Sequence, residues 1–369
     1  MRGIAAVPSY VILQPTTLCN LDCRYCYLPL RAADQRMAPE VAEATAETVN
    51  DWAAAVPRFS VVWHGGEPLA AGTGHLGRLM APFRGVEHHV QTNATLIDDE
   101  WCEFLQARQV RVGVSLDGPE VLSRQRTNRA GRPAYEQIMR GIAALRRHAI
   151  GFAALCVVSE PRPGLAADLY AFFLGLGCHA LGINIEEREG VNARSNAHPP
   201  EAVVTFWAEL AAAWRADPRI ELREIEWTLR YLDAELSGCA DELLPRQLDP
   251  IPVVAQDGRV VLLSPELAGF SDVHYGDFAS GNVLDRPLSR IVADAAGSPA
   301  GWLAEYLHGV EACRTTCPYF GFCGGGHAAN RYFEDGRFDG TQTEHCRNSK
   351  IRLLEGVLAH AREPVAGES

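Results

Sequence analysis

The sequence predicts an α/β protein in which a partial, TIM-like (β/α)6 barrel is followed by a smaller C-terminal domain. Short β-rich runs alternate with helical stretches up to about residue 190, and this order is typical of parallel βα units. After about residue 225 the pattern changes to a hairpin and a second group of cysteines. Because 369 residues exceed the usual size of one domain, we expect two domains, at residues 1–225 and 226–369.

Six runs in the first part carry the signal of buried strands, with many β-branched and apolar residues. They are YVILQ (10–14), FSVVW (59–63), HHVQ (88–91), VRVGVS (110–115), GFAALCVV (151–158) and LGINI (181–185). Six units indicate a partial barrel rather than a closed eightfold one. In barrels of this kind the chemistry gathers at the carboxyl ends of the strands, and the conspicuous motifs of this half lie there.

Helices are predicted between the strands. Residues 39–56 place Val41, Thr45, Val49, Trp52 and Val56 on one face at helical spacing, with Pro39 near the start. Residues 98–109 and 135–148 indicate two more amphipathic helices. In the second part, Asp257-Gly258 marks the turn of a hairpin within IPVVAQDGRVVLLSPEL.

Composition and charge exclude several classes of protein. An apolar share of 47% indicates a real core, and a net charge of −12 argues against a protein that binds nucleic acid through its phosphates. The sequence offers neither a signal peptide nor a membrane span, so we expect a cytoplasmic protein with no membrane partner. In that compartment we do not expect the eleven cysteines to form disulfides.

Three of these cysteines, Cys19, Cys23 and Cys26, lie on one short segment after the first strand, and no further cysteine follows until Cys102. Three thiolates can hold three irons of a four-iron, four-sulfide cluster, whose usual complement is four cysteines. The fourth iron would then be open to a non-protein ligand. The alternatives are a zinc site, which would usually need a fourth Cys or His nearby, and three unconnected cysteines.

The C-x3-C-x2-C motif, with Tyr25 before the last cysteine, resembles the signature of the radical S-adenosylmethionine (SAM) superfamily. The resemblance implies that SAM chelates the open iron and that its reductive cleavage yields a 5′-deoxyadenosyl radical. Three further segments agree with the superfamily: HGGEP, QTNA and VSLDGP. The residues that the resemblance implies for cofactor binding are Tyr25, Gly65, Gly66, Glu67, Pro68, Asn93, Ser115, Asp117 and Arg126.

A second cysteine group consists of Cys313, Cys317, Cys323 and Cys346. Four thiolates suffice for one fully ligated cluster, and spacing alone does not separate iron–sulfur from zinc. CxxxCxxxxxCGGG followed by a later cysteine is similar to the SPASM, or twitch-like, extension of peptide-modifying radical SAM enzymes. Full SPASM domains carry two auxiliary clusters, but here Ser264 and His327 stand where further cysteines would be. The resemblance therefore implies two [4Fe-4S] clusters in all, one that binds SAM and one auxiliary.

The other histidine and cysteine candidates receive structural interpretations. His327 is either a stray ligand or, as we expect, a solvated or hydrogen-bonded side chain. We interpret Cys102, Cys156 and Cys178 as small buried apolar residues, and we expect Cys239 not to be a ligand. Glu186, Glu187 and Glu189 follow the sixth strand, at the mouth of the barrel. They are candidates for contact with a substrate, although a solvated acidic loop explains them equally well.

Within the superfamily, VILQPTTLCNLDCRYCYLPLR, INIEEREGVN and SPEL resemble the maturases that form cyclophanes in ribosomally made peptides, including the glycine-rich-repeat peptide maturases. The resemblance runs from about residue 8 to residue 348. It implies hydrogen abstraction from a side-chain Cβ of a precursor peptide and carbon–carbon bond formation to an aromatic ring. It also implies an electron donor such as a flavodoxin or ferredoxin.

Two other interpretations stay open on the sequence alone. One is a related peptide modification, such as thioether formation, epimerisation, or dehydrogenation of a serine or cysteine. The other is a zinc-stabilised interaction protein without catalysis. The sequence assigns no catalytic acid or base, and it names neither the peptide nor the oligomeric state.

Overall fold

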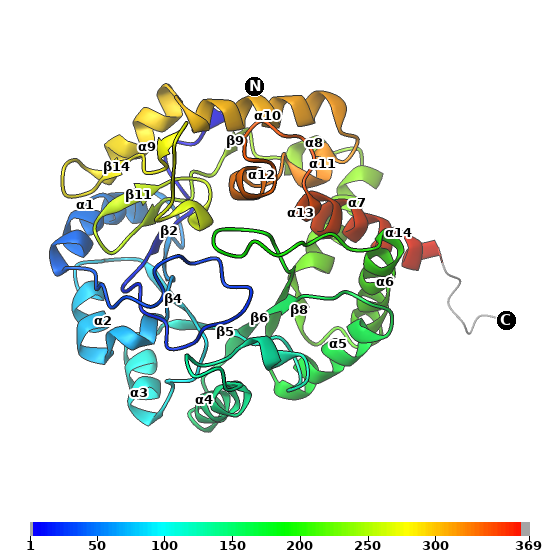
Figure 1. Cartoon of the computed structure of the whole chain (residues 1–369), viewed down its shortest axis with the longest axis horizontal. Coiled ribbons are helices and arrows are strands. Elements are labelled where there is room, and N and C mark those ends of the chain that lie inside the picture. The colour runs from blue at the N-terminus through cyan, green and yellow to red at the C-terminus, as the bar shows by residue number, and fades with distance from the viewer. Residues whose placement is uncertain (1–2, 363–369) are drawn as a thin grey trace.

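A computed structural model describes residues 3–362 and shows a curved sheet of ten strands with helices on its outer side (Figure 1). The strand order is β14-β11-β10-β2-β3-β4-β5-β6-β7-β8. The parallel core of the first part comprises β2 (Tyr10–Leu13), β3 (Ser60–Trp63), β4 (Glu87–Thr92), β5 (Arg111–Ser115), β6 (Phe152–Val158) and β7 (Ala180–Ile185). This arrangement confirms the six predicted strands and the partial barrel.

The helices of the first part form the outer layer in Figure 1. They are α1 (Pro39–Ala55), α2 (Thr73–Met80), α3 (Asp99–Ala107), α4 (Tyr135–Arg147), α5 (Leu165–Leu176), α6 (Pro200–Ala216) and α7 (Arg223–Leu236). Helix α1 buries Val41, Thr45, Val49 and Trp52, and Pro39 occupies its first turn, both as predicted. Val56 was expected on the same face, but it follows the last helical residue as the C-cap and is only half-buried.

One strand of the barrel was missed. The two-residue strand β8 (Glu221–Leu222) extends the parallel sheet beyond β7. Its residues, Glu and Leu, are too few to produce the alternation that predicts a strand from sequence.

The second part continues the same sheet. The predicted hairpin forms from β10 (Val253–Val254) and β11 (Arg259–Val261), and its turn contains Gly258 at φ +85°. Strand β10 also pairs in parallel with β2, so the hairpin lies beside the first strand of the barrel. The other short strands are β14 (Gly281–Asn282), β9 (Gln247–Leu248), which pairs with β1 (Gly3–Ile4), and the pair β12 (Ser271–Asp272) and β13 (Gly276–Asp277).

Helices make up the rest of the second part. They are α8 (Ala240–Leu243), α9 (Leu288–Gly297), α10 (Trp302–Thr316), α11 (Phe320–Cys323), α12 (Ala328–Asp335), α13 (Glu344–Cys346), a π-helical turn at Arg347–Ile351 and α14 (Arg352–Arg362). Helix α14 packs against α6 of the barrel. The proposed division between residues 225 and 226 falls within α7 and stays a prediction.

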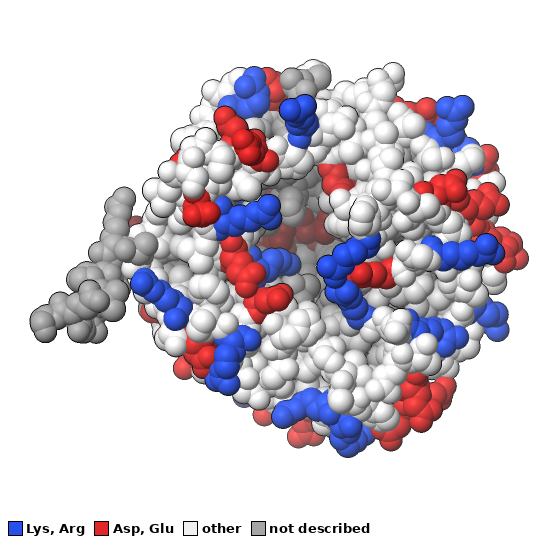
Figure 2. Space-filling view, turned by 180° about the vertical axis from the view of Figure 1, so that it is seen from behind, with Lys and Arg blue, Asp and Glu red and all other residues white. Residues whose placement is uncertain are grey.

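The face of the molecule opposite to that of Figure 1 is hollowed near its centre, and its Lys and Arg side chains are interspersed with Asp and Glu (Figure 2). Within residues 3–362, no helix is both long and apolar enough to cross a membrane.

Candidate functional site

A cavity of about 290 Å³ lies at the carboxyl ends of the barrel strands. It brings together nine of the residues predicted from the sequence: Cys19, Cys23, Tyr25, Cys26, Gly66, Glu67, Asn93, Ser115 and Arg126. These residues come from four separate segments of the chain, which the parallel sheet aligns at one edge. The other predicted cofactor residues, Gly65, Pro68 and Asp117, do not line the cavity.

The loop that carries the three N-terminal cysteines is held by backbone and arginine contacts. The Cys26 amide donates to the Cys23 carbonyl (3.1 Å), and Arg129 donates to the carbonyls of Cys19 (2.7 Å) and Arg31. Burial raises the pKa of the Cys19 thiol to about 12 and that of Cys23 to about 11, and the Glu67 carboxyl adds to the effect at Cys19. Without a bound cation, these thiols therefore stay protonated.

Gly66 allows two backbones to meet beside the cysteine loop. Its φ is +61°, and a Cβ at this position would lie 2.6 Å from the Leu18 carbonyl oxygen. The Glu67 amide donates to the same carbonyl (2.8 Å). Only glycine satisfies both the dihedral angle and the close approach. The motif therefore joins the end of β3 to the segment just before Cys19.

Glu67 is a buried carboxylate whose oxygens are fully engaged. It accepts hydrogen bonds from the amides of Leu69 (3.0 Å) and Asn93 (2.8 Å) and from the Thr92 hydroxyl (2.6 Å). Burial raises the pKa of Glu67, and these donors oppose the rise. Asn93 in turn donates to Cys19 Sγ at 3.8 Å. Glu67 thus orients the strand end that carries Asn93 toward the thiols.

Arg126 faces the cavity from a buried ion pair. Its Nε and Nη2 donate to the two oxygens of Asp117 (3.0 and 2.8 Å), and the Tyr25 hydroxyl donates to Asp117 Oδ2 (2.6 Å). Burial alone would lower the pKa of Arg126, but the Asp117 charge raises it well above its ordinary value. A buried, permanently charged guanidinium can bind a ligand carboxylate, and Asp117 positions it.

Four carboxylates form another part of the cavity lining: Glu186, Glu187, Glu189 and Glu266. Glu186 and Glu189 are only 5% and 6% exposed, so the alternative of a solvated acidic loop is wrong. Glu266 was not predicted, although it lies in the SPEL segment. The half-buried pair of Tyr27 and His64, whose Oη and Nε2 are 3.0 Å apart, was missed as well. Single polar residues at strand ends are too common to be recognised without the fold.

The four C-terminal cysteines meet around a second, smaller hollow of about 20 Å³. Arg331 is 3% exposed, and its Nη2 donates to Cys313 Sγ (3.4 Å) and to the Gly325 carbonyl (2.6 Å). The contact with the Cys346 thiol lowers the pKa of Cys323 to about 5, and the Lys350 charge adds to the effect. This group therefore has basic partners supplied by the protein itself.

Ser264 and His327, the two residues at expected cysteine positions, have contacts of their own. The buried Ser264 hydroxyl accepts from the Ala329 amide (3.2 Å), which links the hairpin to the start of α12. His327 lines the hollow of the C-terminal cysteines, and its ring lies 5.0 Å from the His345 ring. Cys102, Cys156 and Cys178 are buried in the hydrophobic core, as expected. Cys239 is half-buried, and the expectation that it is not a ligand stays a prediction.

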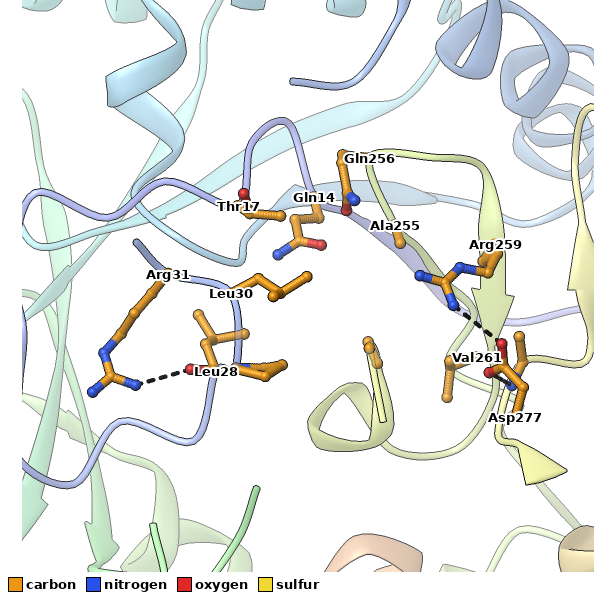
Figure 3. Close-up of a pocket in the computed structure, with 14 residues that line it drawn as sticks. Gln14, Thr17, Leu28, Leu30, Arg31, Ala255, Gln256, Arg259, Val261 and Asp277 are labelled. Atoms are coloured by element: carbon orange, nitrogen blue, oxygen red, sulfur yellow. Dashed lines mark hydrogen bonds and ion pairs between the residues drawn. The ribbon is translucent and has the colours of Figure 1, made fainter. Parts of the chain in front are cut away.

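A third hollow lies between the cysteine loop and the hairpin (Figure 3). Leu28, Leu30 and Val261 give it an apolar lining. Each arginine that lines it has an acidic partner: Arg31 with Asp22 (2.7 Å) and Arg259 with Asp277 (3.1 Å). The C-terminal hairpin and the cysteine loop therefore face each other across this hollow.

The donor sets fit iron–sulfur clusters. Three thiols share a cavity with room for a further ligand, and four thiols surround a much smaller hollow. Within residues 3–362 no three His, Cys, Asp or Glu side chains are spaced to hold a single metal ion. A cluster does not require that spacing, because each thiolate binds a different iron.

Comparison with known proteins gives three kinds of similarity. Residues 13–159 match the family model described as "Radical SAM superfamily". The chain is 31% identical over 372 residues to an uncharacterized protein of Synechocystis sp., covering 96% of this chain and 92% of that protein. It is also 33% identical over 187 residues to a serine-type anaerobic sulfatase-maturating enzyme of Bacteroides thetaiotaomicron. This match covers 47% of this chain and 45%, about half, of that enzyme.

Solved structures share the fold. The structure of anSMEcpe with bound AdoMet and the Cp18Cys peptide superposes with a TM-score of 0.71, at 21% identity, covering 95% of this chain and 97% of that chain. Streptococcus suis SuiB bound to its precursor peptide SuiA gives a TM-score of 0.59 at 13% identity, covering 80% and 66%. These likenesses confirm the predicted partial barrel with a C-terminal extension.

Proposed function

Because this chain belongs to the radical SAM superfamily, we propose that it is an enzyme that modifies a ribosomally made peptide. One observation carries the proposal: three thiols of one loop share an open cavity with a buried guanidinium and a glycine-lined turn. The cofactors are S-adenosylmethionine and [4Fe-4S] clusters. When bound, they supply a carbon-centred radical that removes a hydrogen atom from the substrate.

The residues of the chain have separate tasks in this proposal. Cys19, Cys23 and Cys26 would hold three irons of the cluster and leave the fourth open to SAM. Arg126 binds the methionine carboxylate, and Gly66 allows the backbone to approach the amino group. Asn93 and Ser115 contribute polar contacts from the ends of β4 and β5. Glu67 and Asp117 position these groups from behind, since their own oxygens are already hydrogen-bonded within the protein.

The C-terminal cysteines hold the auxiliary cluster in this proposal. The hydrogen bond from Arg331 to Cys313 and the nearby Lys350 offset the negative charge of the thiolates. Such a cluster is suited to accept an electron from the substrate after hydrogen abstraction. A flavodoxin or ferredoxin delivers the electron that begins each turnover.

We further propose that the product contains a carbon–carbon crosslink. A hydrogen atom leaves a side-chain Cβ, and the resulting radical forms a bond to an aromatic ring of the same peptide. One electron, which the auxiliary cluster would accept when bound, and one proton then leave the ring and restore aromaticity. The peptide loses two hydrogens per crosslink. The resemblance of the cysteine loop, INIEEREGVN and SPEL to cyclophane-forming maturases supports this choice.

A second candidate is the oxidation of a serine or cysteine side chain in a protein substrate. The 33% identity to a serine-type sulfatase-maturating enzyme over about half of the chain favours it. Oxidation of a serine to an aldehyde also removes two hydrogens, so mass alone does not distinguish the two products.

Coexpression with a candidate precursor from a neighbouring reading frame tests the proposal. We expect a loss of two hydrogens per modified motif and, in tandem mass spectra, no fragmentation between the crosslinked residues. A product that reacts with hydroxylamine would instead be an aldehyde, which would assign the second candidate. Anaerobic reconstitution should give about eight irons with matching sulfide per chain. About two zincs without sulfide would contradict both candidates.

A further inference from the structure

The cavity has a strongly acidic side that cofactor binding does not require. Glu186, Glu187 and Glu189 follow β7, and Glu266 belongs to the turn after β11. All four line the same cavity as the cysteines, and we call them the acidic wall. The cysteines and Asn93, which are proposed to bind the cofactors, follow β2 and β4. The acidic wall follows β7 and β11, so it belongs to other elements.

The segment that carries three of these residues is pinned against the cysteine loop. Gly190 has φ +55°, and a Cβ there would lie 2.1 Å from the Tyr27 carbonyl oxygen. The Val191 amide donates to the same carbonyl (3.0 Å). Since Tyr27 directly follows Cys26, the acidic wall is held at the mouth of the cluster site rather than on a free loop.

The acidic wall has fewer cations than carboxylates. Within residues 3–362, its ion-pair partners are Arg194, whose Nε lies 3.5 Å from Glu186 Oε1, and His345, whose Nδ1 lies 3.1 Å from Glu187 Oε2. Arg126 also faces the cavity, but Asp117 binds it through two hydrogen bonds. Even with His345 protonated, four carboxylates would face two cations.

One oxygen of the wall is buried without any partner. Glu186 is 5% exposed and its Oε2 accepts no hydrogen bond, although its Oε1 accepts from Asn192 (3.3 Å). An unsatisfied buried carboxylate oxygen is costly, so its persistence beside a cavity points to a donor that arrives from outside.

The protonation behaviour of the wall agrees with a missing positive charge. Burial, together with the negative charges of Glu187, Glu266 and Glu334, raises the pKa of Glu189 well above its ordinary value. Burial and the Glu187 charge likewise raise the pKa of Glu266 to about 7. A cation placed among these groups would reverse both shifts, because it favours the ionised carboxylates.

We infer that the acidic wall binds the positively charged side chain of a lysine or arginine in the peptide substrate and so orients the peptide over the cluster. This inference rests on the proposed function, because it assigns a charge requirement to the same substrate. Glu186 and Glu189 are specificity residues in this view. An ammonium or guanidinium group supplies several N–H donors, one of which can pair with the unsatisfied Glu186 Oε2.

Affinity selection of synthetic peptides tests the inference without turnover. The probes are pentapeptides that contain one phenylalanine. Each position around the phenylalanine is varied in turn to lysine, arginine, norleucine or citrulline. They are incubated anaerobically with the reconstituted enzyme and SAM, and retained peptides are quantified by mass spectrometry. We expect lysine or arginine peptides to be retained about tenfold more strongly than their neutral isosteres, a difference that equals about 1.4 kcal/mol. High salt should reduce the preference.

Variants locate the effect. Glu186→Gln and Glu189→Gln should each reduce the preference to about threefold or less, because glutamine keeps the shape but cannot ionise to pair with the bound cation. Glu47→Gln, on the exposed face of α1, is the matched control and should keep the full preference. Thermal melts of every variant show that the fold is retained. If norleucine and lysine peptides bind equally, or if no peptide is retained, the inference is wrong. The mass shift of the precursor tests the proposed function separately. If charged peptides are preferred but no precursor is modified, the proposed function is wrong and the charge preference stands.

Discussion

The two cysteine groups of this protein are built in opposite ways. The N-terminal group has three thiols on one loop at the edge of a cavity of about 290 Å³. The C-terminal group has three thiols within residues 313–323 and a fourth from Cys346 around a hollow of about 20 Å³, with the Arg331 guanidinium against one of them. In the proposed function, the first group (the open group) needs a further ligand to complete its cluster, whereas the second (the closed group) has the four thiols that a cluster requires. The difference teaches that thiol count and cavity size together predict which of two proposed clusters meets a substrate.

The sharpest test removes one thiol from each group. Cys23→Ala should abolish SAM cleavage, to below roughly a thousandth of the wild-type rate, because the cluster that binds SAM loses a ligand. Each of the two variants should lose about four irons per chain. Cys323→Ala, however, should retain measurable SAM cleavage. Iron analysis and chromatography of 5′-deoxyadenosine provide the measurement. Cys239→Ala is the control and should change neither value. Equal loss of SAM cleavage in the Cys23 and Cys323 variants would remove the distinction between the groups.

A second test concerns the turn that shapes the open group. Gly66→Ala should weaken SAM binding about 10- to 100-fold, because the new Cβ would collide with the Leu18 carbonyl 2.6 Å away. Equilibrium dialysis of the reconstituted enzyme measures the affinity. Gly72→Ala is the matched control, because Gly72 also has a positive φ (+82°) but no atom within 4 Å of its Cβ position. If both variants lose SAM equally, backbone strain rather than the contact explains the loss.

A third test concerns the cation of the closed group. Arg331→Met should lower the free energy of unfolding by about 3 kcal/mol, because it leaves the buried carbonyls of Gly325 and Phe338 without a donor. Auxiliary iron should also be lost faster on dilution. Chemical denaturation and timed iron release measure the two effects. Arg314→Met, an exposed arginine of α10, should change stability by less than about 0.5 kcal/mol. Retention of full stability by the Arg331 variant would contradict the assigned role.

The smallest expected effect is a pH dependence of stability, which should have opposite signs for Glu266 and Glu187 of the acidic wall. Glu266 has a pKa of about 7 instead of 4.5, so its contribution to stability is present below about pH 4.5 and is lost as the pH rises through 7. Glu187 has the opposite behaviour, because His345 and Asn330 lower its pKa to about 2 against the effect of burial. Its contribution is present above about pH 4.5 and is lost as the pH falls toward 2.

Denaturation of the reconstituted enzyme between pH 5 and 8 checks both signs. The free energy of unfolding of the wild type should fall toward pH 8, and Glu266→Gln should reduce this fall by on the order of 1–3 kcal/mol. Glu187→Gln should lower stability throughout this range. A Glu266 variant with the same pH slope as the wild type would mean that Glu266 does not ionise there.

Much of the fold and part of the site follow from the sequence. The six strands and α1 are predicted because β-branched runs and the 3.6-residue period dominate their local energetics. The cysteine loop is predicted because three thiols in eight residues have few other uses. Glu266 and Arg331 were missed, since each acts only after segments far apart in the chain come together. The sequence also did not decide whether Glu186 is buried or solvated, because loop residues after a strand give no periodic signal.

The pairing of β10 with β2 has a consequence for how the protein is made. The hydrogen-bonding edge of the first barrel strand receives its partner from residues 253–254, more than 200 positions later. At ribosomal rates of about 5–20 residues per second, that edge stays bare for roughly 10–50 seconds. An unprotected strand is a template for wrong associations, so the nascent chain depends on protection until its last third has emerged. Slow translation or early release should therefore reduce the yield of native protein even where every site residue is intact.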